Sequence, residues 1–149
     1  MDADAMGRWM ERTRSILASV LLRGPTDGRT LKCILYLVDA DYCEITESDF
    51  SGCEYTRIGD VPEPDLFDEA VEGLVSEGIV AFDGGTYRLL TPPDLSFLEP
   101  EERKVLGMVI GYTRGKTPED VMGIVHRDLP WADSEDGEVL DLDLAVYRR

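Results

Sequence analysis

The sequence has little positive charge and no long apolar run. Its 149 residues contain 15 Lys and Arg against 31 Asp and Glu, which gives a formal net charge of -16. Phosphate backbones and anionic membranes repel such a protein, so nucleic acid is a disfavoured partner and an electrostatically steered partner should be basic. Because the sequence contains no membrane-length apolar stretch and no signal-peptide pattern, we expect a cytoplasmic protein with no membrane partner.

Cysteine and histidine are also scarce. Cys33, Cys43 and Cys53 lie ten residues apart, whereas structural zinc sites bring their ligands in close pairs. We therefore expect reduced thiols, no metal and no cofactor. The single histidine, His126, would be the first candidate for acid-base chemistry, but no nucleophile stands beside it in a recognisable catalytic motif. The alternative is a histidine that caps a helix end or packs near Trp131, and an enzyme ranks last among the functions considered.

What the sequence does contain predicts one globular domain over residues 1–149. The hydrophobic fraction is 43% and the charged fraction 31%, which is enough apolar material for a core. Apolar spacing and turn residues predict helices over 5–22, 30–42, 64–77, 100–113 and 117–126, of which 30–42 should be the most buried. A short strand is expected over 53–58, a hairpin with a Gly-rich turn over 79–90, and a strand or irregular anchored end over 139–147.

These elements predict a mainly helical α+β fold with a winged-helix-like centre and a small β-hairpin. The order helix, glycine, hairpin around Gly78 is that of a winged helix-turn-helix. In the helix over 64–77, Phe67, Ala70, Val71, Leu74 and Val75 should face inward. Pro64 suits the first turn of this helix.

The negative charge is concentrated in the middle of the chain. Residues 33–102 carry a net charge of -16, whereas residues 1–32 carry +2 and residues 103–149 carry -2. The helix that a winged fold would place in the DNA major groove contains no Lys or Arg. Its acidic residues are the candidate partner-binding residues: Asp65, Asp68, Glu69 and Glu72. We expect this helix not to read DNA, and we interpret Asp39 with Asp41, like Asp65 with Glu69, as solvated acidic pairs.

Several segments together resemble the Panacea-domain (SocA-like) family. Leu31 to Asp39 is similar to the Lys-Leu-Leu-Tyr-aliphatic-Asp helix of that family. The segment from Tyr55 to Pro62 resembles its next block, an aromatic strand followed by a Gly-Pro-aliphatic-Pro turn. Leu74 to Ile79 matches the end of the helix after that, and Thr117 to Trp131 resembles the closing helix with its histidine and tryptophan. The resemblance covers about residues 8–144, and the matching positions are Lys32, Tyr36, Asp39, Gly59, Pro62, His126 and Trp131.

The resemblance implies a non-enzymatic protein-binding domain. Family members are antitoxins that neutralise a toxin or adaptors that present it to a protease, so the implied partner is a protein such as a basic toxin or a protease. The family has no catalytic residues, and the matching positions are expected to be structural. An acidic surface is compatible with a basic partner because complementary charge speeds association. The alternative hypothesis is a winged-helix transcription regulator.

Overall fold

The computed structural model describes residues 3–148, in which helices dominate and the strands are short. The α-helices are α1 (Ala3–Val20), α2 (Gly28–Thr46), α3 (Phe67–Ser76), α4 (Pro100–Thr113), α5 (Pro118–His126) and α6 (Leu129–Ala132). The 3-10 helices are η1 (Leu21–Arg23) and η2 (Leu142–Tyr147). The strands are β1 (Thr26–Asp27), β2 (Tyr55–Ile58), β3 (Val61–Pro64), β4 (Val80–Asp83) and β5 (Thr86–Leu89). The predicted mainly helical α+β class is confirmed.

One half of the fold has the order of a winged helix. β1 lies between α1 and α2, and the hairpin of β4 and β5 follows α3. The three strands form an antiparallel sheet of order β1–β5–β4, in which Tyr87 of the central strand pairs with Thr26 on one side and Phe82 on the other. Gly84 and Gly85 form the turn at positive φ, which glycine adopts without steric cost. The predicted hairpin and winged-helix-like centre are therefore present.

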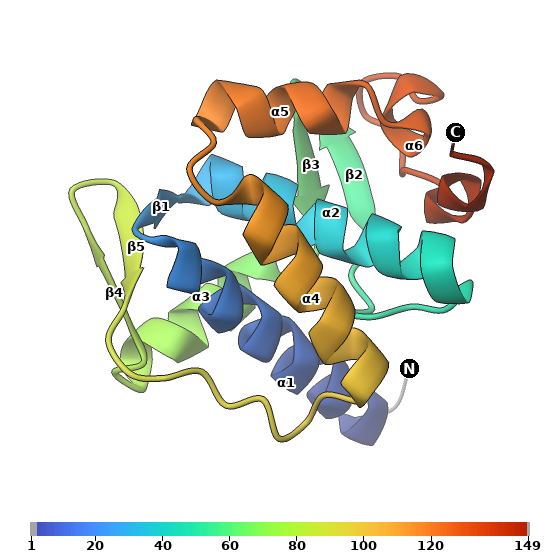
Figure 1. The fold of residues 1–149 in the computed structure, drawn as a ribbon. Coiled ribbons are helices and arrows are strands. Elements are labelled where there is room, and N and C mark those ends of the chain that lie inside the picture. Colours follow the sequence, from blue (N-terminus) through green and yellow to red (C-terminus); the bar gives the residue numbers. More distant parts are fainter. Residues whose placement is uncertain (1–2, 149) are drawn as a thin grey trace.

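Helix α2 is the axis of the molecule. Figure 1 shows it between α5 above and α1 below, with α4 crossing in front. Its buried residues lie on every side of the helix and include Leu31, Leu35 and Val38. The prediction that this is the most buried helix is confirmed. The helix is longer than predicted: its last residue is Thr46, and the next residue, Glu47, caps it with a φ of 57°.

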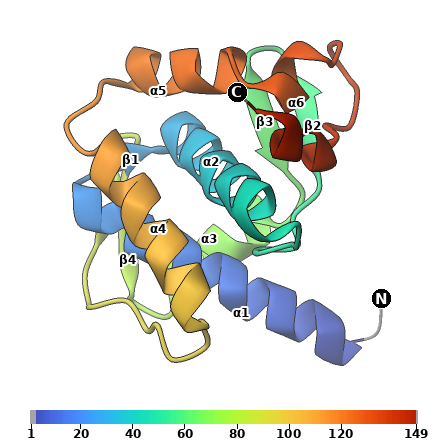
Figure 2. The ribbon, with the colours of Figure 1, turned by 45° about the vertical axis from the view of Figure 1, so that its right-hand side comes forward.

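The other half is built around an antiparallel ribbon of β2 and β3, inserted between α2 and α3. Figure 2 shows α5, α6 and this ribbon together on the side of α2 opposite α1. The chain after α6 returns to β2: Leu140 donates its N–H to the Tyr55 carbonyl at 2.8 Å, and Val139 forms a bridge with Thr56. The strand predicted over 53–58 is confirmed at Tyr55–Ile58.

One predicted helix start is wrong. Pro64 does not begin a helix; it ends β3 opposite Tyr55, and α3 begins at Phe67. Within residues 3–148, β3 pairs with no strand other than β2. Its other edge forms no sheet hydrogen bonds within that range, so the N–H groups that the two prolines lack are not needed there. The tail forms the irregular anchored end that was the alternative to a strand: the Asp141 side chain accepts the Asp143 N–H at 3.1 Å and starts the 3-10 turn of η2.

Local capping explains where the other helices begin. The Asp27 carboxylate accepts the N–H of Thr30 at 2.8 Å at the start of α2. Reciprocal side-chain bonds form capping boxes at Glu99 with Glu102 in α4 and at Thr117 with Asp120 in α5. The starts predicted at Pro100 and just after Thr117 are confirmed.

Candidate partner-binding face

Asp39 forms a buried polar centre rather than part of a solvated pair. Its carboxylate accepts the N–H and the hydroxyl of Ser51, at 2.8 and 2.5 Å, and the hydroxyl of Tyr55. Burial raises the pKa of Asp39 to about 6, although the bonds from Ser51 and Tyr55 act in the opposite direction. Asp39 thus joins α2 to the start of β2 from inside the protein.

Asp41 is buried as well, so the solvated interpretation of both aspartates is wrong. Its carboxylate accepts the Tyr112 hydroxyl at 2.7 Å and pairs with Arg148. These partners lie 71 and 107 residues away along the chain. A local pattern cannot reveal such partners, although the nearly continuous apolar run Cys33 to Val38 was a signal that this part of α2 is enclosed.

The remaining motif residues on α2 also face neighbouring elements. Tyr36 donates its hydroxyl to Asp128 at 2.6 Å and packs edge-on against Tyr55, with ring centroids 5.6 Å apart. Lys32 pairs with Glu63 of β3 at 2.7 Å and lies 5.0 Å from the Phe67 ring centroid. Lys32 therefore ties α2 to both the ribbon and the start of α3.

The ribbon turn and the end of α5 hold the other motif residues. His126 stacks on Trp131 with ring centroids 4.7 Å apart, as the packing alternative predicted, and its Nε2 lies 2.8 Å from the Asp60 carbonyl. Gly59, at φ 60°, donates its N–H to Asp136 at 2.7 Å. Pro62 is buried in β3. These contacts are intramolecular and give each motif position a role in the packing of the ribbon.

The candidate partner-binding carboxylates lie at and just before the start of α3. All four are exposed: Asp68, Glu69 and Glu72 lie in the helix that a winged fold would offer to DNA, and Asp65 lies two residues before it. Asp65 also accepts the Glu54 N–H at 3.0 Å, which fixes one of its oxygens. All four carboxylates are therefore accessible to solvent at or near α3.

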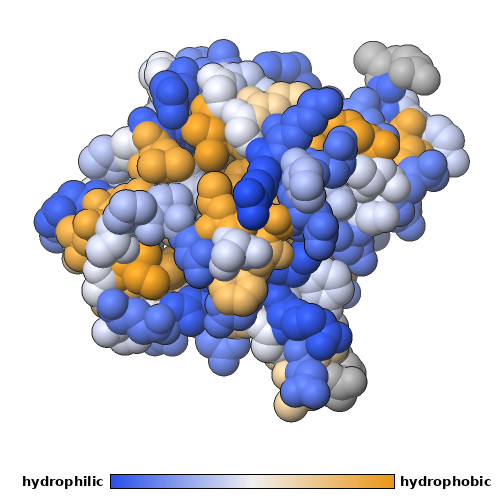
Figure 3. All heavy atoms as spheres, turned by 60° about the horizontal axis from the view of Figure 1, so that its bottom comes forward, coloured by the Kyte–Doolittle hydropathy of each residue, from blue (hydrophilic) through white to orange (hydrophobic). Residues whose placement is uncertain are grey.

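An apolar hollow lies beside these carboxylates, between α3 and the hairpin. Its volume is about 430 Å³, and its lining residues are Val71, Glu72, Val75, Ser76, Phe82 and Tyr87. Val75 is 40% exposed and Phe82 52% exposed. The prediction that Val75 faces the core is wrong, because it comes in the last turn of α3 and lines this hollow. The underside view in Figure 3 shows hydrophobic residues in orange set among hydrophilic ones in blue.

The basic residues near this face are engaged with carboxylates. Arg88 of the wing pairs with Asp83 at 3.4 Å, and Arg14 of α1 pairs with Glu77 at 2.5 Å. The pKa of Tyr87, which lines the hollow, is raised mainly by burial and to a smaller extent by the nearby Asp68 carboxylate. The face defined by α3 and the hairpin thus combines a small apolar hollow with the exposed carboxylates of α3.

Across residues 3–148, no group of three or more His, Cys, Asp or Glu side chains is arranged to hold a metal ion. Cys33, Cys43 and Cys53 are free thiols and all are buried. None of the helices in the described part of the chain is both long and apolar enough to cross a membrane.

The fold and this face define a mainly helical α+β domain with a winged-helix-like half and an acidic helix α3. Comparison with models of protein families, with curated proteins and with solved structures found no match.

Proposed function

We propose that the chain is a non-enzymatic protein-binding module that acts like the Panacea-domain (SocA-like) antitoxins and adaptors it resembles. Its partner is a basic protein, such as a toxin to be neutralised or presented to a protease. The observation that carries the proposal is the apolar hollow between α3 and the hairpin, which Glu72 helps to line, with the exposed carboxylates of Asp68 and Glu69 on the preceding turn of α3.

The two parts of this face have different energetic roles. Burial of Val75 and Phe82 against a partner supplies the hydrophobic contribution to affinity, about 25 cal/mol for each Å² of apolar surface removed from water. The carboxylates attract a basic partner over a distance of about 10 Å at 0.1 M salt and favour its productive orientation. The same carboxylates repel the phosphates that a DNA-reading helix must approach.

The test is capture of partners from the native host with the wild-type chain and two triple variants. Asp68→Asn, Glu69→Gln and Glu72→Gln together remove three charges from the face. The control, Glu101→Gln, Glu119→Gln and Asp133→Asn, removes three exposed charges from α4, α5 and the end of α6. We expect the face variant to lose at least about tenfold of a basic partner quantified by mass spectrometry, while the control keeps it. Equal retention by both variants would remove the basis of the proposal.

The strand order β1–β5–β4 favours a second candidate, a winged-helix transcription regulator. This candidate requires DNA to approach α3 or the wing despite the carboxylates of α3. It predicts retarded migration of duplex DNA at submicromolar protein and low salt, and sensitivity of that shift to Arg88→Ala in the wing. The absence of a shift under these conditions argues for the protein-binding function.

A further inference from the structure

The last described residue, Arg148, inserts its guanidinium among three carboxylates. Its Nε and Nη2 bond both oxygens of Asp128, at 2.7 and 2.5 Å, and its Nη1 lies 2.5 Å from Asp41 and 3.0 Å from Glu44. The side chain of Arg148 is 16% exposed, that of Asp41 11% and that of Asp128 9%. Such bidentate, largely desolvated pairing is the geometry that a guanidinium favours over an ammonium.

The carboxylates are positioned by groups other than Arg148. Tyr36 of α2 donates to Asp128, and Tyr112 of α4 donates to Asp41. Burial and the Asp128 carboxylate raise the pKa of Tyr36, so its hydroxyl keeps its proton and remains a donor. The pocket is therefore formed by α2, α4 and the start of α6, and Arg148 fills it from the tail.

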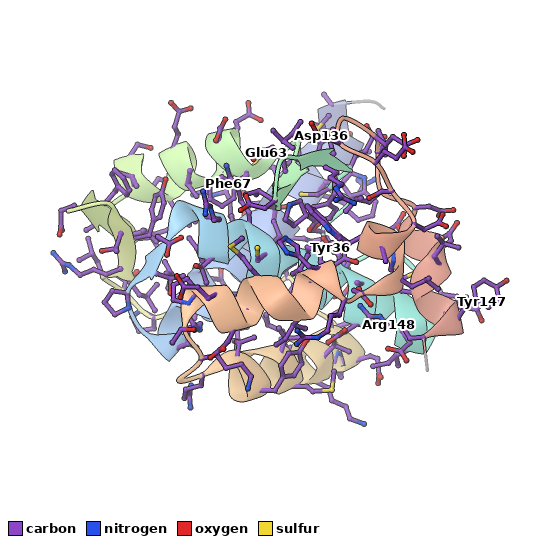
Figure 4. All side chains as sticks on the ribbon, turned by 90° about the horizontal axis from the view of Figure 1, so that it is seen from above. Tyr36, Glu63, Phe67, Asp136, Tyr147 and Arg148 are labelled. Atoms are coloured by element: carbon purple, nitrogen blue, oxygen red, sulfur yellow. The ribbon has the colours of Figure 1, made fainter. Side chains whose placement is uncertain are left out.

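Apart from the bonds of Arg148, the tail beyond Leu140 is attached by packing rather than by hydrogen bonds to distant residues: η2 lies against α2 and α6, and Leu142 packs against the core. Within residues 141–148, the backbone hydrogen bonds outside helices and strands are local. Leu144 donates its N–H to the Asp141 carbonyl, and Arg148 donates its N–H to the Ala145 carbonyl. Among these eight residues only Ala145 is fully buried. In Figure 4, Tyr147 projects outward at the edge of the molecule while Arg148 lies closer to its body. A hollow of about 710 Å³ adjoins both residues.

We propose that residues 141–148 form a strap that Arg148 latches into a guanidinium-binding pocket, and that this strap opens as a unit while the rest of the fold stays closed. Opening replaces the Arg148 guanidinium with water, leaves Asp41 and Asp128 facing one another, and makes the pocket available to another guanidinium. The hydroxyls of Tyr36 and Tyr112 still hold the Asp128 and Asp41 carboxylates in position after opening. The pocket therefore keeps its preference for a guanidinium.

The alkylation rate of the Cys43 thiol can measure opening of the strap. This residue of α2 is 4% exposed, and burial together with the Asp143 carboxylate of the strap raises the pKa of its thiol. Cys33 and Cys53 are also buried and free, so they serve as internal references for opening of the rest of the fold. The rate of alkylation at each thiol, read by peptide mass spectrometry, separates strap opening from unfolding.

The experiment compares wild-type chain with Arg148→Ala, each with no addition, with millimolar methylguanidinium and with methylammonium. We expect Arg148→Ala to accelerate modification of Cys43 at least about tenfold and leave Cys33 and Cys53 unchanged. Methylguanidinium should slow the reaction of Cys43 in the variant, and methylammonium should not. Added peptide with the sequence of residues 144–148 should slow it further if an arginine on a peptide also enters the pocket.

Three results would overturn the proposal: equal acceleration at all three thiols, no acceleration at Cys43, or equal protection by methylguanidinium and methylammonium. If Arg148→Ala does not fold, Arg148→Lys provides the same comparison, because an ammonium retains the charge without bidentate pairing. In that variant, methylguanidinium must still protect Cys43 more than methylammonium does.

Discussion

Asp39 shows how a single buried carboxyl can set a pH dependence. The residue is 4% exposed and receives three donors from Ser51 and Tyr55. Those donors favour the ionised form, but burial outweighs them and raises the pKa from 3.8 to about 6. The folded state therefore binds the Asp39 proton more tightly than the unfolded state does between these two values.

A raised pKa on an acid means that its stabilising contribution is present below pH 3.8 and is lost as pH rises through about 6. We predict that the free energy of unfolding of wild type, relative to that of Asp39→Asn, falls by about 2.5 kcal/mol between pH 4 and pH 7.5. Urea unfolding of both proteins across this range measures the difference, in which the other carboxylates cancel. A difference that does not vary with pH would mean that Asp39 stays ionised throughout.

At the scale of elements, one ion pair joins α1 to the start of α4. Arg12 pairs with Glu102, which is 2% exposed, and Arg12 also donates to the Phe50 carbonyl at 2.9 Å. The Glu102 side chain accepts the Glu99 N–H at 2.7 Å, so it caps α4 and neutralises Arg12 at the same time. The position of α4 against α1 thus depends on one side chain with two functions.

We predict that Glu102→Ala lowers the free energy of unfolding by about 4 kcal/mol and Glu102→Gln by about 2 kcal/mol, because Gln keeps the cap but loses the charge. The exposed neighbour Glu101 provides the control: Glu101→Gln should change the free energy of unfolding by less than about 0.5 kcal/mol. Combined with Arg12→Met in a double-mutant cycle, Glu102→Gln should give a coupling of at least about 1 kcal/mol. Additive effects would show that the two side chains are energetically independent.

The elements that sequence patterns predict well are those whose signals are local. Pro100, Thr117 and the glycines at 84 and 85 mark boundaries within a few residues, and the structure has helices and a turn there. β3 escaped prediction because its signal is its pairing with β2, while its two prolines resemble a turn or helix start.

The same distinction separates the parts of the candidate site. The acidic side of α3 follows from composition and helix geometry, so it was predictable, whereas the hollow needs the hairpin to fold beside Val75. The Arg148 pocket was not predictable at all. Its groups come from α2, α4, the start of α6 and the tail, and nothing local to any of them indicates the others.

The charge of the whole molecule produces a testable response to salt. With 31 acidic and 15 basic residues, repulsion among carboxylates opposes the compact state. We predict that raising NaCl from 20 mM to 500 mM increases the Tm by several degrees, because the screening length falls from about 20 Å to about 4 Å. Calorimetry in NaCl and in KCl should give the same shift. A Tm that falls with salt would mean that attractive pairs such as Arg12 with Glu102 dominate the electrostatics.

The sheet order β1–β5–β4 also has a consequence for the order in which the strands pair during folding. β4 and β5 are neighbours in the chain and can pair at little entropic cost, whereas β1 pairs with β5 between residues 26 and 87, which closes a loop containing α2, the ribbon and α3. The two-residue strand β1 is too short to hold that loop closed alone. We therefore expect the third strand to join only after α1, α2 and α3 have packed, so that completion of the wing is a late event in folding.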